Sequence, residues 1–436
     1  MQVLEAEKII GIKTFFTPFE GTGGKLRTIP DDFIVKEISN YPPDIKDGKF
    51  AIADVKTRNY ETNLLIRDIS NRLHISRMRI GFAGTKDKRA VTSRLMSFYN
   101  IPTDELSKIK IKDVEFCNIY RSNKPVKIGN LIGNSFEITI RDIDKNVKSQ
   151  DVKKIYSLFI KKGGFPNFYG IQRFGIIRPI THIVGRYIVK DDFQKAVMSY
   201  IANPIKGEDE DIYILREKLQ KTEDFASALN TYPDSLNYEK AILNKLIIEK
   251  DDFVGAIKEL PKNLLTMFIN GYQSYLFNQV LSERIKRKLP LNEAVEGDII
   301  LPIRRGVLDK KGIIVNQRNI DKINKQISKS KAVISGVLIG SDTQIAEGEM
   351  GEIENRIIEK EKINPKDFII PDISYISSFG SRRSLIGFIK NFECRLIKDT
   401  LNDGKKALFL RFELQKGCYA TSLLREFMKA DDIKCY

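Results

Sequence analysis

Length sets the first limit on the architecture of this chain. With 436 residues, it exceeds what one hydrophobic core usually supports, because cores rarely grow beyond roughly 250–300 residues before a chain divides. Hydrophobic residues make up 42% of the sequence, which is ordinary for a globular protein and argues against disorder. We therefore expect a folded protein with two domains.

An excess of basic residues narrows the class of partner. Lys and Arg number 73 against 57 Asp and Glu, a net charge of +16. This excess favours polyanions, because each neutralised phosphate releases condensed counterions. No apolar run approaches the roughly 20 residues that a membrane helix needs, and the segment MQVLEAEKII lacks a signal-peptide pattern. We expect a cytoplasmic protein with no membrane contact.

Reactive side chains are few. The four cysteines include no C-x-x-C pair, and His74 and His182 are the two histidines. This inventory argues against a zinc site, a disulfide framework or a cysteine–histidine pair. Chemistry in this chain is expected to rest on carboxylates, aromatic rings and cations, without a metal. The glycine-rich segment GTGGKLR (21–27) is no phosphate-binding loop, because Leu26 stands where that motif needs Ser or Thr, and it reads as an ordinary turn.

Hydrophobic periodicity predicts a mixed α/β architecture. Strand-like segments lie at 31–38, 78–84, 135–141 and 407–414, and helix-like segments lie at 62–74, 152–160 and 263–288. A further helix should follow Gly417, capped by Thr421 or Ser422. Periodicity alone does not say whether the C-terminal strand joins the N-terminal sheet.

The segment GFAGTKDKRAVTS (81–93) contains the aspartate that we single out. Asp87 lies between Lys86 and Lys88, with Arg89 next. Three cations within two residues favour an ionised carboxylate, and a loop after a glycine-ended strand is a usual place for reactive side chains. On spacing alone, an exposed turn in which Asp87 balances lysines is the better interpretation.

The exact residues of this segment favour a catalytic role for Asp87 over the exposed turn. AGTKDKRAVTS closely resembles the active-site motif of the TruD family of pseudouridine synthases. Five other blocks resemble the family in the same order: PDDFIVKEI (30–38), LIGNSFEI (131–138), FPNFYGIQRFG (165–175), YQSYLFNQVL (272–281) and GCYATSLLRE (417–426). The stretches 205–260 and 300–370 contribute nothing to the resemblance.

The resemblance implies roles for individual residues. Asp87 matches the family's catalytic aspartate, and Phe33, Asn134 and Tyr419 match positions that line the uridine pocket. Phe136 matches an aromatic residue of the same G-N-x-F block. Each pocket residue has a plainer alternative: Phe33 and Phe136 suit the core of a sheet, and a Gly-Asn pair is more often a turn than a ligand. Tyr419 has the better case, because a buried hydroxyl needs a partner.

Basic residues are expected near the RNA. Arg27 falls where relatives carry a basic residue near the site, and Lys86, Lys88 and Arg89 flank the aspartate. Arg173 either contacts RNA or clamps the junction between domains, and we favour the structural role. The expected substrate-binding residues are Phe33, Asn134, Phe136, Tyr419 and Arg27, and the candidates for RNA binding are Lys86, Lys88, Arg89 and Arg173.

The implied chemistry explains why so few groups suffice. Pseudouridine formation breaks the N1–C1′ bond, turns the uracil and joins C5 to C1′, so neither a redox cofactor nor a metal is required. A carboxylate can attack the sugar as a nucleophile or remove the C2′ proton as a base, and the sequence leaves both routes open. The base must leave its stack, which calls for aromatic walls such as Phe33 and Tyr419, while the Asn134 amide can pair with the uracil edge.

The resemblance also implies a discontinuous architecture. A catalytic domain with a mainly antiparallel sheet would be formed by residues 1–164 and 391–436, and an inserted α/β TRUD domain by residues 165–390; spacing alone permits three consecutive domains. In relatives the target is the uridine at position 13 of tRNA, so tRNA is the expected partner, with other RNAs left open and no obligate protein partner. The rivals are a non-catalytic RNA-binding protein and a nucleoside or glycoside hydrolase, which would need a second carboxylate.

Overall fold

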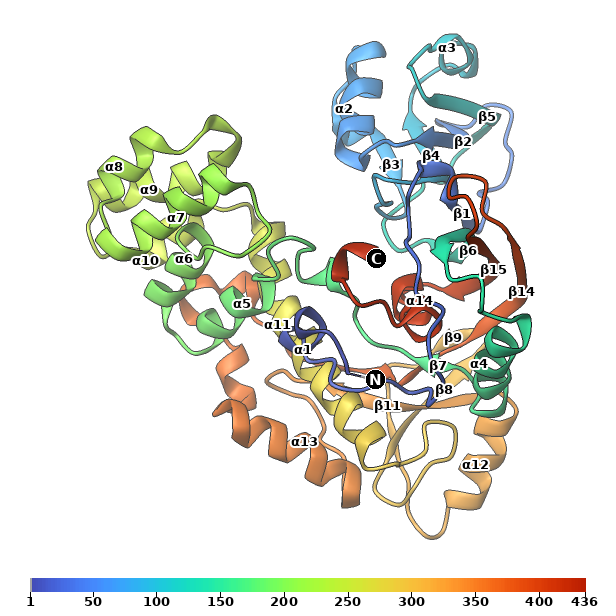
Figure 1. The fold of residues 1–436 in the computed structure, drawn as a ribbon. Coiled ribbons are helices and arrows are strands. Elements are labelled where there is room, and N and C mark those ends of the chain that lie inside the picture. Colours follow the sequence, from blue (N-terminus) through green and yellow to red (C-terminus); the bar gives the residue numbers. More distant parts are fainter. Residues whose placement is uncertain (1) are drawn as a thin grey trace. The chain divides into compact units, whose positions relative to one another are not determined.

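The computed structural model describes residues 2–436 and divides into two compact units (Figure 1). The sheet unit consists of Thr17–Phe165 and Gly387–Tyr436, and the insert unit consists of Pro166–Ile386 together with the chain up to Phe16. The family resemblance implies that the N-terminal residues belong with the rest of 1–164, but residues 2–16 group with the middle of the chain instead.

An eight-stranded sheet forms the centre of the sheet unit. Its strands run in the order β14-β15-β6-β1-β4-β2-β5, with β3 paired to β4. All neighbours are antiparallel except β1 and β4, which are parallel. The strands are β1 (Phe33–Ser39), β2 (Phe50–Arg58), β3 (Ile80–Phe82), β4 (Val91–Tyr99), β5 (Val114–Ser122), β6 (Leu131–Ile143), β14 (Ile389–Lys398) and β15 (Lys406–Gln415).

Four α-helices accompany this sheet among the described residues. They are α2 (Thr62–Arg72), α3 (Thr103–Lys108), α4 (Ser149–Lys161) and α14 (Ala420–Met428). The helix α14 begins at Ala420 with Tyr419 as its N-cap residue, so the predicted cap at Thr421 or Ser422 is wrong. The mixed α/β class and the mainly antiparallel sheet are confirmed.

The two ends of the sequence meet in this one sheet. The strand β15 pairs with β6, with Phe412 opposite Phe136 and Leu410 opposite Ile138. Alternate residues of β1 face opposite sides: Phe33 and Val35 are buried, whereas Lys36 is exposed and forms an ion pair with Glu137. One side therefore packs into the core, and the other carries cross-strand ion pairs.

The insert unit combines a smaller sheet with a helical part. Its strands run in the order β10-β8-β11-β12, with β9 on β8, and every pair is antiparallel. They are β8 (Ile299–Arg304), β9 (Val307–Leu308), β10 (Ile313–Ile314), β11 (Ala332–Leu338) and β12 (Ser381–Ser384). The two-residue strands β7 (Phe165–Pro166) and β13 (Ile386–Gly387) lie where the chain passes between units.

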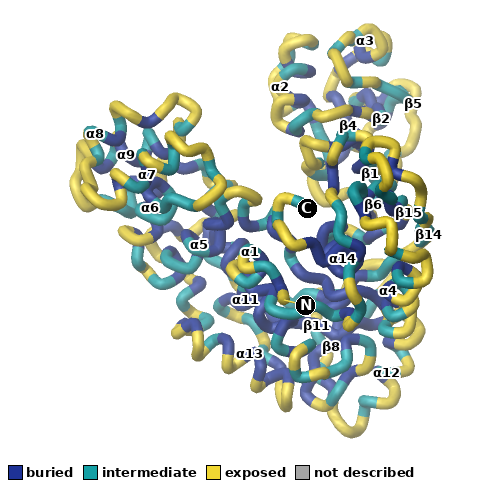
Figure 2. Tube along the Cα trace, viewed as in Figure 1, coloured by how far each residue is buried: buried dark blue, intermediate teal, exposed yellow. Residues whose placement is uncertain are grey.

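The long helix α11 (Lys262–Lys286) is buried along most of its length (Figure 2). It holds the N-terminal segment, because Asn278 donates to the Ile10 carbonyl at 2.9 Å and Ser282 to the Gly11 carbonyl at 2.9 Å. The remaining helices of the unit are α1 (Glu5–Ile9), α5 (Thr181–Val189), α6 (Phe193–Ile201), α7 (Glu210–Thr222), α8 (Phe225–Thr231), α9 (Asn237–Ile248), α10 (Phe253–Lys258), α12 (Ile320–Ser328) and α13 (Gly348–Glu361). Of the helices described, none has the length and apolar character to cross a membrane.

Candidate active site

Asp87 lies in the loop that joins β3 to β4, and strand pairing explains its surroundings. The strand β4 begins at Val91, which pairs with Ile34 at the start of β1 in the parallel register. Because parallel strands begin at the same edge of a sheet, the loop before β4 lies beside the first residues of β1. The aspartate therefore lies near Phe33, although 54 residues separate the two in the sequence.

Asp87 forms an ion pair with Arg27. The Arg27 Nη2 atom is 3.0 Å from Asp87 Oδ2, and the Asp87 side chain is 46% exposed whereas that of Arg27 is 10% exposed. No hydrogen bond within residues 2–436 reaches the second oxygen, Oδ1. The guanidinium also donates to the Tyr436 carbonyl at 2.8 Å and covers the Phe33 ring, 4.0 Å from its centroid. The result is an oriented, half-exposed carboxylate whose Oδ1 atom has no hydrogen-bond partner among the described residues.

The glycine-rich segment 21–27 positions Arg27. Its backbone follows the end of α14, because Thr22 N–H donates to the Phe427 carbonyl at 2.8 Å. A Cβ atom on Gly21 would lie 2.1 Å from the Met428 carbonyl oxygen, so only glycine allows this approach. Arg27 itself has a left-handed φ of 55°, and Arg89 Nη2 donates to its carbonyl at 3.1 Å. A left-handed φ is strained for any residue other than glycine, and Arg27 keeps this conformation because surrounding contacts hold it.

Lys86 points into the protein, away from solvent. Its Nζ atom is 2.6 Å from Glu37 Oε2, and the two side chains are 5% and 1% exposed. Burial lowers the pKa of the Lys86 ammonium group, and the Glu37 carboxylate opposes that shift. A cation so enclosed is not offered to a phosphate, which does not fit the expected RNA contact of Lys86.

A buried arginine supports the same loop. Arg94 donates to Thr62 Oγ1 at 2.8 Å and to Thr92 Oγ1 at 2.8 Å, and burial lowers its pKa to about 10. Thr62 Oγ1 also accepts from the Lys86 backbone N–H at 3.1 Å. Sequence reasoning missed Glu37, Thr62 and Arg94. The strand alternation in FIVKEIS could have indicated Glu37, because it shares a face with Phe33 and Val35.

Three phenylalanines form a buried row beside the aspartate. The Phe33 and Phe136 rings meet edge to face at 6.3 Å, and Phe136 stacks on Phe412 at 5.3 Å. Phe33 is 1% exposed and Phe136 is 6% exposed. These two rings belong to the core, so the structure does not present them to a base as the expected pocket walls.

Asn134 and Tyr419 are half-buried rather than core residues. Asn134 lies within β6, opposite Glu37 on one side and Leu414 on the other, so its interpretation as a turn residue is wrong. Its Oδ1 atom is buried and has no hydrogen-bond partner within residues 2–436. A buried acceptor without a partner calls for an explanation, and a ligand would supply one. Tyr419 follows β15, whose last residues pair with this part of β6.

The other expected cations differ in setting. Lys88 and Arg89 are exposed on the Asp87 loop. Arg173 belongs to the insert unit, where its Nε donates to Ser274 Oγ at 3.4 Å on α11. This contact lies within the insert unit, so it does not test the role at the domain junction that we favour for Arg173.

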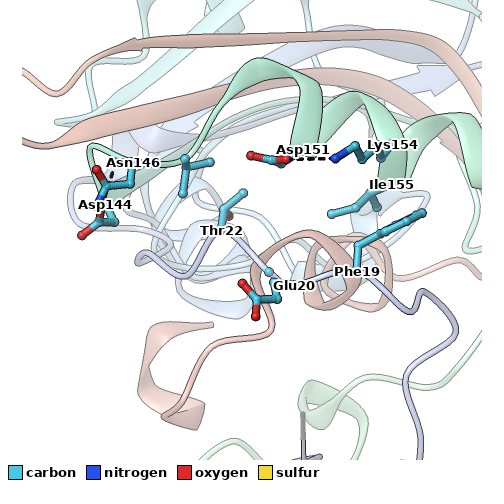
Figure 3. A pocket seen from close by; sticks show the side chains of 10 residues that line it. Phe19, Glu20, Thr22, Asp144, Asn146, Asp151, Lys154 and Ile155 are labelled. Carbon is cyan, nitrogen blue, oxygen red and sulfur yellow. Dashed lines mark hydrogen bonds and ion pairs between the residues drawn. The ribbon is translucent and has the colours of Figure 1, made fainter.

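A separate cavity in the sheet unit has a volume of about 520 Å³ (Figure 3). It is lined by residues 19–22, 144, 146, 147, 151, 154 and 155, and contains none of the expected site residues. Its charged groups are Glu20, Asp144, Asp151 and Lys154, of which the last two form an ion pair at 3.4 Å. A surplus of carboxylates repels phosphate, so this cavity does not suit an RNA backbone.

Comparison with known proteins identifies the family. The family model described as tRNA pseudouridine synthase D (TruD) matches residues 9–427. The chain belongs to the TruD family. It is 41% identical over 436 residues to a protein of Methanococcoides burtonii named probable tRNA pseudouridine synthase D, covering 99% of each chain. A protein of the same name from Methanosarcina barkeri is 42% identical over 441 residues, covering 100% of each.

A solved structure supports the same assignment. The crystal structure of the putative TruD protein from Methanosarcina mazei superposes with a TM-score of 0.87 at 40% identity, and the match covers 98% of this chain and 99% of that one. The resemblance to TruD sequences is thus confirmed at the level of the whole fold. Pseudouridine synthases are isomerases, and membership places this chain in that enzyme class.

Proposed function

We propose that the protein converts the uridine at position 13 of tRNA to pseudouridine, with Asp87 as the catalytic residue and the cytoplasm as its compartment. The observation that carries this proposal is the Asp87–Arg27 pair, 3.0 Å apart, in which Asp87 is 46% exposed and lies within the residues matched by the TruD model. The names of the relatives point to tRNA as the substrate. The choice of position 13 rests on the resemblance to TruD proteins.

Arg27 orients the reacting carboxylate. Its guanidinium holds Asp87 Oδ2 and leaves Oδ1 open, so one oxygen is fixed while the other meets the ribose. That oxygen either attacks C1′ as uracil departs or removes the C2′ proton, and both routes need the ionised carboxylate. In either route the uracil leaves as its N1 anion and turns while enclosed. C5 then bonds to C1′ as the Asp87–C1′ bond breaks or as the proton returns to C2′. Loss of the C5 proton and protonation of N1 complete the isomerisation without a second reactant.

The pocket around the target uracil is built from Asn134 and Tyr419. The unpartnered Asn134 Oδ1 can accept the uracil N3–H, while its amide NH₂ donates to a neighbouring uracil oxygen. Tyr419 supplies the aromatic wall on which the everted base stacks. Phe33 supports the Arg27 guanidinium from below, 4.0 Å away, rather than stacking on the base, and Phe136 packs behind it.

The distribution of charge favours the sheet unit as the RNA surface. Its residues contain 38 Lys and Arg against 25 Asp and Glu, a net charge of +13, while the insert unit has +3. Lys88 and Arg89, both exposed beside Asp87, are the first candidates for phosphate contacts. We assign catalysis to the sheet unit and the TRUD domain to the insert unit.

The test is incubation of an unmodified tRNA transcript with the protein, followed by position-resolved mapping of pseudouridine. Wild type should modify uridine 13, and Asp87→Asn should lose more than about 10³-fold in rate while still binding the transcript. Asp31→Asn is the matched control, because Asp31 is also a half-exposed aspartate paired with an arginine, Arg58.

Other products would point to other functions. Free uracil would indicate a hydrolase, and binding without any product would indicate a non-catalytic RNA-binding protein. Asp87→Asn with unchanged turnover would refute the assignment of this residue.

A further inference from the structure

The loop that carries Asp87 is attached to the interior by the residue beside it. We propose that Lys86, Glu37 and Thr62 form a clamp that positions Asp87 for the reaction, and that Lys86 acts in positioning rather than in RNA binding. This inference rests on the proposed role of Asp87. None of the three clamp residues touches the reacting atoms in our account, so they are positioning residues.

Within the clamp, Lys86 is held by two contacts. The side chain reaches Glu37 on β1 at 2.6 Å, and the backbone N–H donates to Thr62 Oγ1 at the start of α2 at 3.1 Å. Both contacts fix the peptide that leads into Asp87. Thr62 is itself held by Arg94 at 2.8 Å, so the second anchor is also fixed.

Asp87 and Arg89 also tie the loop to Arg27, at 3.0 and 3.1 Å, but between Gly84 and Arg89 only the Lys86 side chain is itself buried. Thr85, Asp87, Lys88 and Arg89 are exposed, and the Lys86 side chain is 5% exposed. A loop of this kind samples many conformations unless it is tied down. The Lys86 contacts therefore hold the backbone that leads into Asp87, while Arg27 holds the carboxylate itself.

Stability alone does not account for an ion pair in this place. Removing two charges from water costs several kcal/mol per ion, and well-packed apolar residues usually stabilise a fold equally well. What a salt bridge adds is direction, because it joins two defined atoms across 49 residues of sequence. That property suits a catalytic loop, where a displacement of about 1 Å can cost about 10²-fold in rate.

Glu37 also connects the two halves of the site. It lies opposite Asn134 in the β1–β6 register, so the strand that holds the Asp87 loop also pairs with the residue proposed to bind the uracil. Its Oε2 accepts from Lys86 and its Oε1 from Ser39 Oγ at 2.6 Å. Both oxygens are engaged and the side chain is 1% exposed, so Glu37 is not a second acid/base catalyst.

The experiment measures the single-turnover rate of tRNA modification at saturating enzyme, together with tRNA affinity. Lys86→Met should lower the rate constant by about 30–100-fold while the tRNA Kd changes less than about threefold, because no phosphate contact is lost. Lys86→Arg, which can still reach Glu37 as a cation, should recover part of the rate. Glu37→Gln should slow the reaction in the same way.

A matched control separates positioning from general destabilisation. Glu239→Gln removes a buried carboxylate from Arg216, 2.8 Å away in the insert unit, and should leave the rate constant within about twofold. At saturating enzyme the rate constant reports bound complexes and is insensitive to the folded fraction. If Lys86→Met does not fold, the double variant Glu37→Gln/Lys86→Met, which removes both buried charges, replaces it.

The outcomes distinguish this inference from the proposed function. Wild-type protein that forms no pseudouridine refutes the function itself. Active wild type and inactive Asp87→Asn, together with a folded Lys86→Met or double variant at the wild-type rate, refute the clamp alone. Loss of tRNA affinity with an unchanged rate constant would instead assign Lys86 to RNA binding.

Discussion

Asp87 in the sheet unit and Glu361 in the insert unit show two ways of using a carboxylate. Asp87 is half exposed and has one partner, Arg27. Glu361 is 5% exposed, pairs with Arg186 at 3.3 Å and accepts hydrogen bonds from three side chains of α11, namely Tyr272, Tyr275 and Gln279. A carboxylate whose oxygens are all engaged holds a structure together, whereas one with an open oxygen can react.

The same contrast extends to charge. The two units carry net charges of +13 and +3, so most of the attraction for a polyanion lies in the unit that holds Asp87. The insert unit instead buries neutral and paired groups around α11, including His182, which stacks on Tyr275 at 4.9 Å. Exposure and net charge thus both differ between the surroundings of Asp87 and those of Glu361.

Replacing the arginine partner of each carboxylate should give the largest difference in reaction rate between the two regions. Arg27→Met leaves Asp87 without its orienting partner and should lower the single-turnover rate by about 10²-fold. Arg186→Met removes the partner of Glu361 and should leave the rate within about twofold. Rate measurements on an unmodified tRNA transcript test both, and equal losses in the two variants would erase the distinction drawn between the carboxylates.

Buried His182 in the insert unit should make the free energy of unfolding depend on pH. Burial lowers the pKa of His182 to about 4, so in the folded protein it stays neutral while the unfolded chain takes up a proton near pH 6.5. The free energy of unfolding should therefore fall as the pH drops from about 6.5 to 4, by up to about 3 kcal/mol from this residue.

Urea unfolding across that pH range provides the measurement. His182→Phe should flatten the dependence, and His74→Asn, at an exposed position with a left-handed φ of 52°, should leave it as in wild type. An unchanged slope in His182→Phe would mean that this histidine does not report on the buried cluster.

The smallest expected difference concerns single surface cations. Lys88→Met should weaken tRNA binding a few-fold and reduce the salt dependence of log K by about 0.7–0.9, the contribution of one phosphate contact. Lys250→Met removes an exposed lysine from the insert unit and should alter neither quantity. Binding titrations at several salt concentrations decide this, and equal effects would remove the link between net charge and the RNA surface.

Much of the architecture was accessible from the sequence. Alternation predicted the strands that became β6 and β15, and helical spacing predicted α2 and α11 within a few residues. The block GTKDKRA located Asp87 through the family resemblance. Local patterns of this kind depend on residues close in sequence, which is why they could be interpreted without coordinates.

Directions of side chains were harder to predict. Lys86 and Asp87 are neighbours in a cationic run, yet one side chain is buried against Glu37 and the other is half exposed. Composition records charge, but not which way each residue of an irregular loop points. Phe33 was expected in the pocket, and the structure covers its ring with Arg27, a contact that no spacing could indicate.

The amino-acid order by itself determined the family and many of the secondary-structure elements and singled out Asp87, because those depend on local patterns and a recognisable motif. The folded chain decided which charges meet. Residues 27, 37, 62, 86 and 94 converge only because β1 and β4 run parallel and their neighbours pack around them. Whether a carboxylate is left open or fully engaged is a property of that packing.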